Sequence, residues 1–259
     1  MELFKIHTPL VQPVPLIANL PHSGMFIPQN IAGQFTPYIL QSLPNTDWHL
    51  DKLYNFLPSL GITVLQANYS RYAVDLNREF NETLSGNFWS AIVPLQTAFN
   101  QPVYIKNPSA EEVQEHCQKF YIPYHNELNK IIQYKLKQFG KLYILDLHSF
   151  FGPINDQICL GNVNGKSCDE SFTSLVEESF INQGYQVVRN KKFTGGYITR
   201  HYSLIKNVAT LQIEIRYHLY LDINQLDKPE FPDWDVPQFT TARNNFKEIF
   251  TSIANQLSI

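Results

Sequence analysis

Charged residues are few in this sequence, and no long run of one sign is present. They make up 17% of the 259 residues, and the net charge at pH 7 is −3. A protein that holds nucleic acid or an acidic membrane surface by electrostatic attraction needs a concentration of Lys and Arg. The composition therefore excludes nucleic acid and membranes as expected partners, whereas a local basic pocket for a small acidic molecule is compatible with it.

Cysteine is scarce, and long hydrophobic segments are missing. The three cysteines, Cys117, Cys159 and Cys168, are odd in number and lack CxxC spacing, so we expect reduced thiols rather than a disulfide framework. No stretch approaches the roughly 18 apolar residues of a membrane-spanning helix. The first residues also lack the apolar segment of a signal peptide. These features predict a soluble, cytoplasmic protein.

Two familiar catalytic motifs are absent as well. The segment from Gly161 to Ser167 has the composition of a phosphate-binding loop, but its glycines stand one residue too close for the GxxxxGK[ST] pattern. We therefore discount nucleotide binding. The HExxH helix, which supplies two zinc-binding histidines in many metalloproteases, is also missing. Any metal ligands must therefore come from separate parts of the chain.

Short apolar segments alternate along the chain with segments of helical periodicity. The predicted strands cover 16–20, 62–65, 142–147, 157–160, 185–189 and 209–216, and the predicted helices 35–43, 48–57, 109–139, 170–183 and 239–257. This alternation is typical of a mixed or mainly parallel sheet flanked by helices. We predict a single α/β domain over residues 1–259. The segments 80–110 and 193–202 are predicted to be loops, the first long enough to cover a functional site.

Two histidines stand where predicted strands end. His148 follows the apolar run that begins at Leu142, with Asp146 as a candidate orienting partner, and His22 follows the strand predicted at 16–20. In open α/β sheets, the carboxyl ends of the strands face the ligand-binding crevice. For each histidine the structural alternative is a buried ring that bonds only to its own strand.

Two acidic residues also stand in informative places. Asp47 precedes a segment of helical periodicity, so its carboxylate, or the hydroxyl of Thr46, either caps that helix or serves as a ligand; the sequence leaves both open. Glu214 lies in the last predicted strand, on one face with Gln212 and Arg216. A carboxylate within a buried strand is costly unless it is paired or functional.

Two arginines bracket an alternating apolar and polar stretch. Arg71 and Arg78 stand at its ends, and Asn77 follows the apolar Leu76. Exposed arginines usually belong to a solvated surface. A planar guanidinium group, however, binds both oxygens of a carboxylate, which the ammonium group of lysine cannot do. The pair therefore predicts a pocket that recognises carboxylates.

The combination of two histidines and one short carboxylate is a donor set typical of catalytic zinc. Bound zinc lowers the pKa of a water molecule to about 7. A separate carboxylate can then take the proton of that water and return it to a leaving nitrogen, and Glu214 is the candidate for this role. On spacing alone, purely structural histidines stay the alternative.

Seven stretches of the chain together resemble one known family. They are PHSG at 21–24, TDWHLDKLY at 46–54, SRYAVDLNR at 70–78, YHNEL at 124–128, LDLHS at 145–149, GGYITRHY at 195–202 and LQIEI at 211–215. In this order they resemble the N-formylglutamate amidohydrolase (N-formylglutamate deformylase) family, whose members are similar in fold to zinc carboxypeptidases and to aspartoacylase. One stretch alone would be a weak signal, whereas seven in register are specific.

The resemblance implies catalytic roles for five residues. His22, Asp47 and His148 correspond to the ligands of one zinc ion, which favours the ligand alternative for Asp47. Glu214 corresponds to the general base and acid. Arg71 corresponds to the arginine that stabilises the tetrahedral oxyanion in related amidohydrolases.

The resemblance also implies substrate contacts. Asn77 and Arg78 correspond to the pair that binds a substrate carboxylate. Tyr197, Thr199 and Arg200 correspond to contacts with the second carboxylate or the scissile carbonyl group.

The implied reaction is zinc-dependent hydrolysis of N-formyl-L-glutamate to formate and L-glutamate, in the context of histidine degradation. The alternatives are a zinc amidase or carboxypeptidase that acts on another N-acylated acidic amino acid or a short peptide, and a non-catalytic carboxylate-binding relative. Two departures from the family pattern bear on the substrate: Asn162 stands where the deformylases tend to have Thr, and the segment 80–110 matches loosely. Arg216 and His218 receive no role.

Overall fold

The computed structural model describes residues 2–257 apart from 153, 227 and 229. One sheet contains seven strands in the spatial order β1, β3, β2, β6, β9, β7 and β8. Their bounds are β1 Phe4–His7, β2 Leu16–Leu20, β3 Thr63–Ala67, β6 Leu142–Phe150, β7 Ile158–Gly161, β8 Val187–Arg189 and β9 Val208–Arg216. The central strands β3, β2, β6 and β9 are parallel, while β1 and β7 pair antiparallel with their inner neighbours. The predicted mixed, mainly parallel sheet is therefore confirmed.

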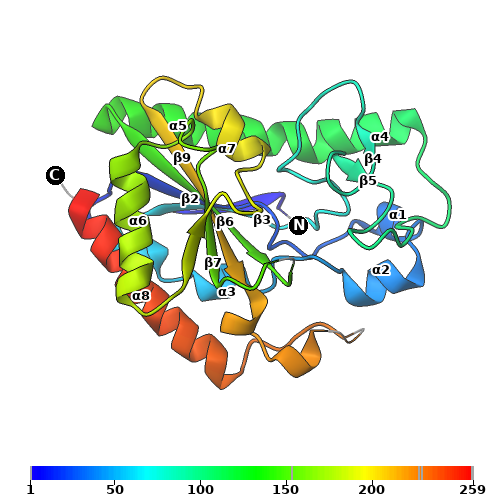
Figure 1. Cartoon of the computed structure of the whole chain (residues 1–259). Coiled ribbons are helices and arrows are strands. Elements are labelled where there is room, and N and C mark those ends of the chain that lie inside the picture. Colours follow the sequence, from blue (N-terminus) through cyan, green and yellow to red (C-terminus); the bar gives the residue numbers. More distant parts are fainter. Residues whose placement is uncertain (1, 153, 227, 229, 258–259) are drawn as a thin grey trace.

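Helices cover both faces of this sheet (Figure 1). Their bounds are α1 Gln29–Ala32, α2 Pro37–Ser42, α3 Leu50–Leu53, α4 Ala110–His116, α5 Ile122–Phe139, α6 Glu170–Asn182, α7 Tyr197–Tyr202 and α8 Pro237–Leu257. The Tyr124 hydroxyl of α5 donates to Asn19 on one face, and Phe172 of α6 stacks on Tyr143 of β6 on the other. Helix α7 lies on the same face of the sheet as α5, and α8 packs against α6. Because both faces are covered, β2 is buried along its whole length.

The long helix predicted from 109 begins as expected and is then interrupted. The Ser109 side chain accepts from the backbone of Glu112, and the Glu112 carboxylate accepts from the backbone of Ser109, which completes a capping box. A π-helical turn at Cys117–Tyr121 joins α4 to α5. Pro123 lies two residues after this turn, so the chain continues as a helix past the predicted kink or break, with a local change of hydrogen-bond pattern.

Two predicted segments are wrong in detail. The helix predicted over 48–57 is reduced to α3, because His49 lies in the left-handed region with φ of 55° and its ring contacts the carbonyl group of the distant Pro232. The segment 193–202, predicted as a loop, ends in helix α7. Its two glycines do allow a close approach, since a Cβ atom on Gly196 would lie 2.2 Å from the Asn77 side chain.

The segment 80–110 lies beside the sheet and is mostly irregular (Figure 1). Strands β4 Ser85–Gly86 and β5 Val93–Pro94 form a small parallel pair within it. Tyr104 pairs with Phe35 in an isolated bridge that joins the segment to the α1–α2 region.

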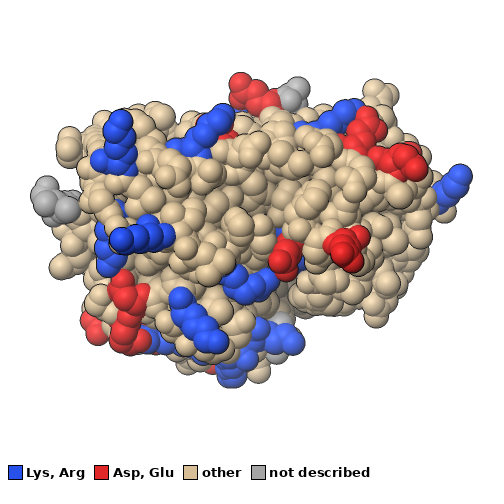
Figure 2. Space-filling model, turned by 90° about the horizontal axis from the view of Figure 1, so that it is seen from above, with Lys and Arg blue, Asp and Glu red and all other residues tan. Residues whose placement is uncertain are grey.

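The described residues also bear on the expectations from composition. None of their helices is long and apolar enough to cross a membrane. Cys117, Cys159 and Cys168 are free and buried. On the face in Figure 2, Lys and Arg occur in several separate places with Asp and Glu between them, so no continuous basic surface covers it.

Candidate active site

The parallel pairing of β6 with β9 sets polar residues side by side. Asp146 lies opposite Gln212, and His148 lies opposite Glu214. Side chains of a strand alternate between faces, so these four share the face that α5 and α7 cover. His148, Gln212 and Glu214 line a cavity of about 710 Å³. The carboxyl-end location predicted from the sequence therefore coincides with a cavity large enough for a small ligand.

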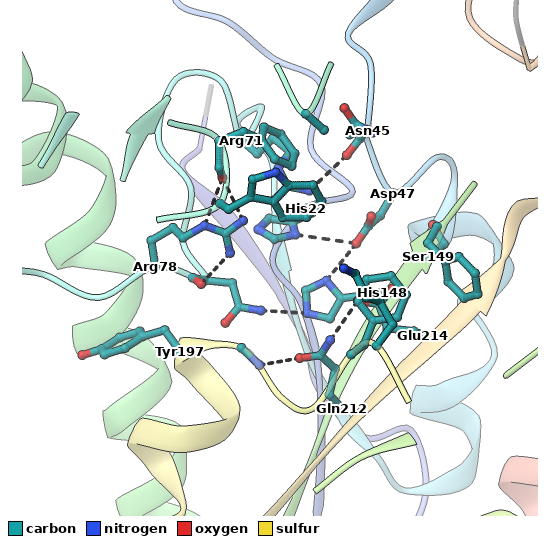
Figure 3. Close-up of a pocket in the computed structure, with 18 of the residues that line it drawn as sticks. His22, Asn45, Asp47, Arg71, Arg78, His148, Ser149, Tyr197, Gln212 and Glu214 are labelled. Atoms are coloured by element: carbon teal, nitrogen blue, oxygen red, sulfur yellow. Dashed lines mark hydrogen bonds and ion pairs between the residues drawn. The ribbon is translucent and has the colours of Figure 1, made fainter. Parts of the chain in front are cut away.

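His22, Asp47 and His148 come together in this cavity, although they are far apart in the sequence (Figure 3). The Asp47 Oδ2 atom lies 3.0 Å from Nδ1 of His148 and 3.8 Å from Nδ1 of His22. One ligand atom from each residue lies within 4.8 Å of the other two, so the group could hold a metal ion. Asp47 does not cap α3, whose N-cap is His49, and the Thr46 hydroxyl donates to a carbonyl group instead.

The partners of the two imidazole rings fit a metal site. Nε2 of His22 lies 2.7 Å from Asp75, and Nε2 of His148 lies 2.9 Å from Asp146. In the neutral, metal-binding form of each ring, a carboxylate at Nε2 favours the tautomer with the proton on that nitrogen, so Nδ1, which faces Asp47, is the ligand atom. The candidate orienting role of Asp146 is consistent with this geometry. Two neutral imidazoles and one carboxylate suit zinc.

Electrostatics differ between the two histidines. Burial and the nearby Arg71 guanidinium lower the pKa of His22 to about 4, so this ring is neutral near pH 7. Burial also disfavours the charged form of His148, but the carboxylates of Asp146 and Asp47 outweigh it and hold its pKa well above the usual value. Metal binding at His148 therefore has to displace a proton.

Glu214 lies at the same site and is 7% exposed. Burial raises the pKa of its carboxyl group to about 8, against the opposing influence of His148 and with the support of Asp47. A carboxyl group with a pKa near the working pH exchanges its proton readily in both directions. Gln212 holds this group in place, since its Nε2 atom donates to Glu214 Oε1 at 2.8 Å.

The residues of the 70–78 stretch are engaged mainly within the protein. Arg71 lines the cavity, and its guanidinium donates to Asp75 at 2.6 Å. The Asn77 amide nitrogen lies 3.3 Å from Asp146, and its carbonyl oxygen accepts from the backbone of α7. Arg78 lines the cavity too, but its guanidinium donates to the carbonyl groups of Asn77 and Phe88. These bonds reduce the capacity of Asn77 and Arg78 to bind a substrate carboxylate.

Three predicted substrate contacts, Tyr197, Thr199 and Arg200, lie in helix α7, but only two of them line the cavity. Tyr197 and Arg200 line the cavity. Arg200 is exposed, and within the described residues its guanidinium makes one hydrogen bond, from Nη1 to the Gly195 carbonyl oxygen. Thr199 is fully buried outside the cavity lining, and its methyl group faces Gly195. Arg200 is therefore the predicted substrate contact with the most donors free for an anion.

Two residues of the site were missed in the sequence. Asp75 bonds to His22 and Arg71, and Gln212 joins Glu214 to Gly196, whose backbone N–H donates to Gln212 Oε1 at 2.6 Å. The available signals were a buried acidic residue inside the 70–78 stretch and a glutamine two positions before Glu214.

Replacing Gln212 with alanine is expected to lower kcat for amide hydrolysis about 10- to 100-fold, because a hydrogen bond to a charged group is worth roughly 1.5–3 kcal/mol. The mutation removes the bond that orients Glu214 and leaves the ligand group intact. Steady-state kinetics and metal content are the measurements. Gln66→Ala is the matched control, because Gln66 is a buried strand glutamine that bonds to His7 away from the cavity. Equal losses in both variants would assign Gln212 a general structural role.

The fold and the site together define a class: an α/β protein with a candidate metal site and a separate buried carboxyl group at the carboxyl ends of its parallel strands. The sequence model of the family "N-formylglutamate amidohydrolase" matches residues 14–221. The chain belongs to this family, as its sequence motifs indicate.

Curated and solved relatives agree with this membership. N-formylglutamate deformylases from Pseudomonas putida and Pseudomonas aeruginosa are 31% and 32% identical over 222 residues, which span 81% of this chain and 82% and 83% of theirs. The crystal structure of N-formylglutamate amidohydrolase from Ralstonia eutropha JMP134 superimposes with a TM-score of 0.82 over 99% of both chains, at 24% identity. A gene product of Agrobacterium tumefaciens, 15% identical, has a TM-score of 0.74 over 100% of this chain and 97% of its own.

Proposed function

We propose that this chain is a zinc-dependent amidohydrolase that cleaves N-formyl-L-glutamate into formate and L-glutamate, with residues 1–259 acting as one catalytic domain. The observation that carries the proposal is the group of His22, Asp47 and His148, with the separate carboxyl group of Glu214 in the same cavity. The Pseudomonas relatives are named for this activity, which supports the choice of substrate.

The proposed cofactor is one zinc ion. The Nδ1 atoms of His22 and His148 and the Asp47 carboxylate would hold it, and three nitrogen or oxygen ligands are typical of catalytic zinc. When bound, zinc supplies Lewis acidity toward a carbonyl group and lowers the pKa of a water molecule to about 7. Asp75 and Asp146 fix the two rings from behind.

Glu214 carries the proton in the proposed reaction. Its carboxylate accepts a proton from the attacking water and delivers it to the amide nitrogen, so the C–N bond breaks with a neutral amine as the leaving group. Formate keeps the oxygen of the water. Arg71 is 7% exposed and fixed by Asp75. It therefore presents a preorganised positive charge for the oxyanion that develops on the formyl carbonyl group.

The carboxylates of the substrate need cations that the protein has not already paired. Arg200 meets this condition best, and Lys192, which lines the same cavity, makes no ion pair within the described residues. Tyr197 lies beside Arg200 and offers a hydroxyl group. We assign Asn77 and Arg78 to the support of the site rather than to direct carboxylate binding, because their polar groups bond to Asp146, α7 and Phe88.

The proposal is tested by incubating the purified chain with zinc and N-formyl-L-glutamate and measuring formate and glutamate together. We expect equimolar release that stops on chelation and returns with zinc. Cleavage of other N-acylated acidic amino acids or short peptides in place of N-formyl-L-glutamate would favour the related amidase. Glutamate binding without turnover would favour a non-catalytic carboxylate-binding protein.

Replacing Arg200 with alanine is expected to raise KM for N-formyl-L-glutamate about 10- to 100-fold with a smaller change in kcat, because a charge-assisted bond to a carboxylate is lost. Arg216→Ala is the matched control. Arg216 also makes one hydrogen bond to a backbone carbonyl group, that of Asn155, and it lies outside the cavity lining. If the two variants have the same KM, Arg200 does not bind the substrate.

A further inference from the structure

Three large aromatic side chains are exposed and line the same cavity. Trp89 is 62%, Phe99 60% and Phe151 42% exposed, and all three belong to the cavity lining. Single exposed apolar residues are common on proteins and need no explanation. Three exposed aromatic residues in the lining of one candidate active site are unusual. Aromatic rings bury a large apolar area when a ligand covers them.

Two of these side chains contact other rings of the cavity lining. Trp89 packs edge-to-face on the buried Phe88, with ring centroids 5.1 Å apart. Phe151, the residue after the end of β6, lies beside the buried Tyr217, with ring centroids 6.5 Å apart. Phe88 also stacks under the Arg71 guanidinium at 4.4 Å, so this apolar wall is continuous with the proposed catalytic residues. Trp89 and Phe151 are therefore held against other aromatic residues of the cavity lining.

The volume of the cavity also indicates space for a ligand larger than N-formyl-L-glutamate. At about 710 Å³ it falls within the range of pockets that enclose drug-sized ligands. N-formyl-L-glutamate is much smaller and is polar over almost its whole surface. It has no group that would cover the three exposed rings, so a substrate limited to a formyl group and glutamate leaves an apolar part of the cavity unused.

We propose that Trp89, Phe99 and Phe151 form a subsite for an apolar group carried by the substrate, so that the chain prefers acidic N-acyl amino acids with a bulky apolar extension. The inference rests on the proposed function, because it uses the same hydrolytic centre and the same cations for the acidic part. The extension has two chemical sources: the acyl group itself, or an apolar residue joined to the α-carboxyl group of a formylated glutamate.

The test compares three substrates under zinc saturation. N-formyl-L-glutamate is the reference, N-phenylacetyl-L-glutamate places a ring on the acyl side, and N-formyl-L-glutamyl-L-phenylalanine places it on the carboxyl side. We expect kcat/KM for one of the two ring-bearing substrates to exceed the reference about 10- to 100-fold, as burial of an aromatic ring predicts. The substrate that gains identifies the source of the extension.

Variants link this gain to the rings. Trp89→Ala is expected to lower the ratio of kcat/KM for the preferred substrate to that for the reference at least about tenfold. Trp234→Ala is the matched control, since Trp234 is 42% exposed and lies outside the cavity lining, and it should leave the ratio unchanged. Phe99→Ala provides a second measurement should Trp89→Ala not fold.

The outcomes separate the two proposals. Cleavage of N-formyl-L-glutamate with no gain for either ring-bearing substrate, or a gain that survives both Trp89→Ala and Phe99→Ala, overturns the subsite and leaves the proposed function standing. Cleavage of a ring-bearing substrate without cleavage of N-formyl-L-glutamate supports the subsite and overturns the proposed substrate. Absence of all hydrolysis overturns both.

Discussion

Replacing Glu214 with glutamine lowers kcat for N-formyl-L-glutamate about 10²- to 10⁴-fold, the usual loss when a general base is removed, and leaves the metal content unchanged. Glutamine has the shape of glutamate and can still accept the hydrogen bond from Gln212. It cannot accept the proton of water or deliver one to the leaving nitrogen. Because Glu214 is not among the proposed ligands, only the chemical step should suffer.

Kinetics and metal analysis of the same preparations check this expectation. Glu79→Gln is the matched control, because Glu79 is exposed, lines the same cavity and has no proposed role; its activity should stay close to that of the unmodified chain. Turnover by Glu214→Gln at an unreduced rate would remove Glu214 from the mechanism. Loss of metal together with activity would instead make Glu214 a ligand.

Much of the fold could be predicted because the signals are local. The apolar runs at 16–20 and 142–147 end abruptly next to histidines, and both are buried strands in the structure. The capping box at Ser109 likewise depends on only four consecutive residues, from Ser109 to Glu112. Glu214 could be singled out because a buried strand rarely contains an unpaired carboxylate. In each case composition within a few residues decides the structure.

The contacts that shape the site depend on residues far apart in the chain. Asp75 bonds to His22 across 53 positions, and the Asn77 side chain bonds to Ile198 across 121. No local pattern reveals such partners, so the sequence assigned Asn77 and Arg78 to the substrate without showing that their polar groups are engaged within the protein. The start of α3 is a similar case, because His49 is held by a distant carbonyl group.

The group of His22, Asp47 and His148 could be predicted only in part from local sequence, because its assembly also depends on contacts between distant residues. Each residue has a local signal, but each signal also fits a structural role: a buried histidine or a helix cap. The family motifs favour ligation, and the geometry removes the capping alternative for Asp47, since His49 occupies the N-cap of α3. Distances between side chains, rather than spacing in the sequence, make the group a candidate metal site.

Replacing His148 with alanine is expected to abolish metal binding and hydrolysis, because one of three proposed ligands is lost. Asp146→Asn should have a graded effect of about 10- to 100-fold on metal affinity or activity, as is usual for a carboxylate that orients a ligating histidine. Asparagine keeps the size of the side chain but removes the negative charge that faces Nε2 of His148. The loss of metal binding and activity is therefore expected to be larger for His148→Ala than for Asp146→Asn.

Zinc titration of the thermal midpoint measures this order independently of activity, because an ion that binds only the folded state raises the midpoint by mass action. The unmodified chain should gain stability at low zinc concentration, Asp146→Asn only at concentrations about 10- to 100-fold higher, and His148→Ala not at all. His218→Ala, which removes a half-buried imidazole outside the cavity lining, is the matched control and should titrate like the unmodified chain. If His148→Ala binds zinc as tightly as this control, the ion is held elsewhere, and the pairing of each imidazole with a carboxylate serves the stability of the fold instead of catalysis.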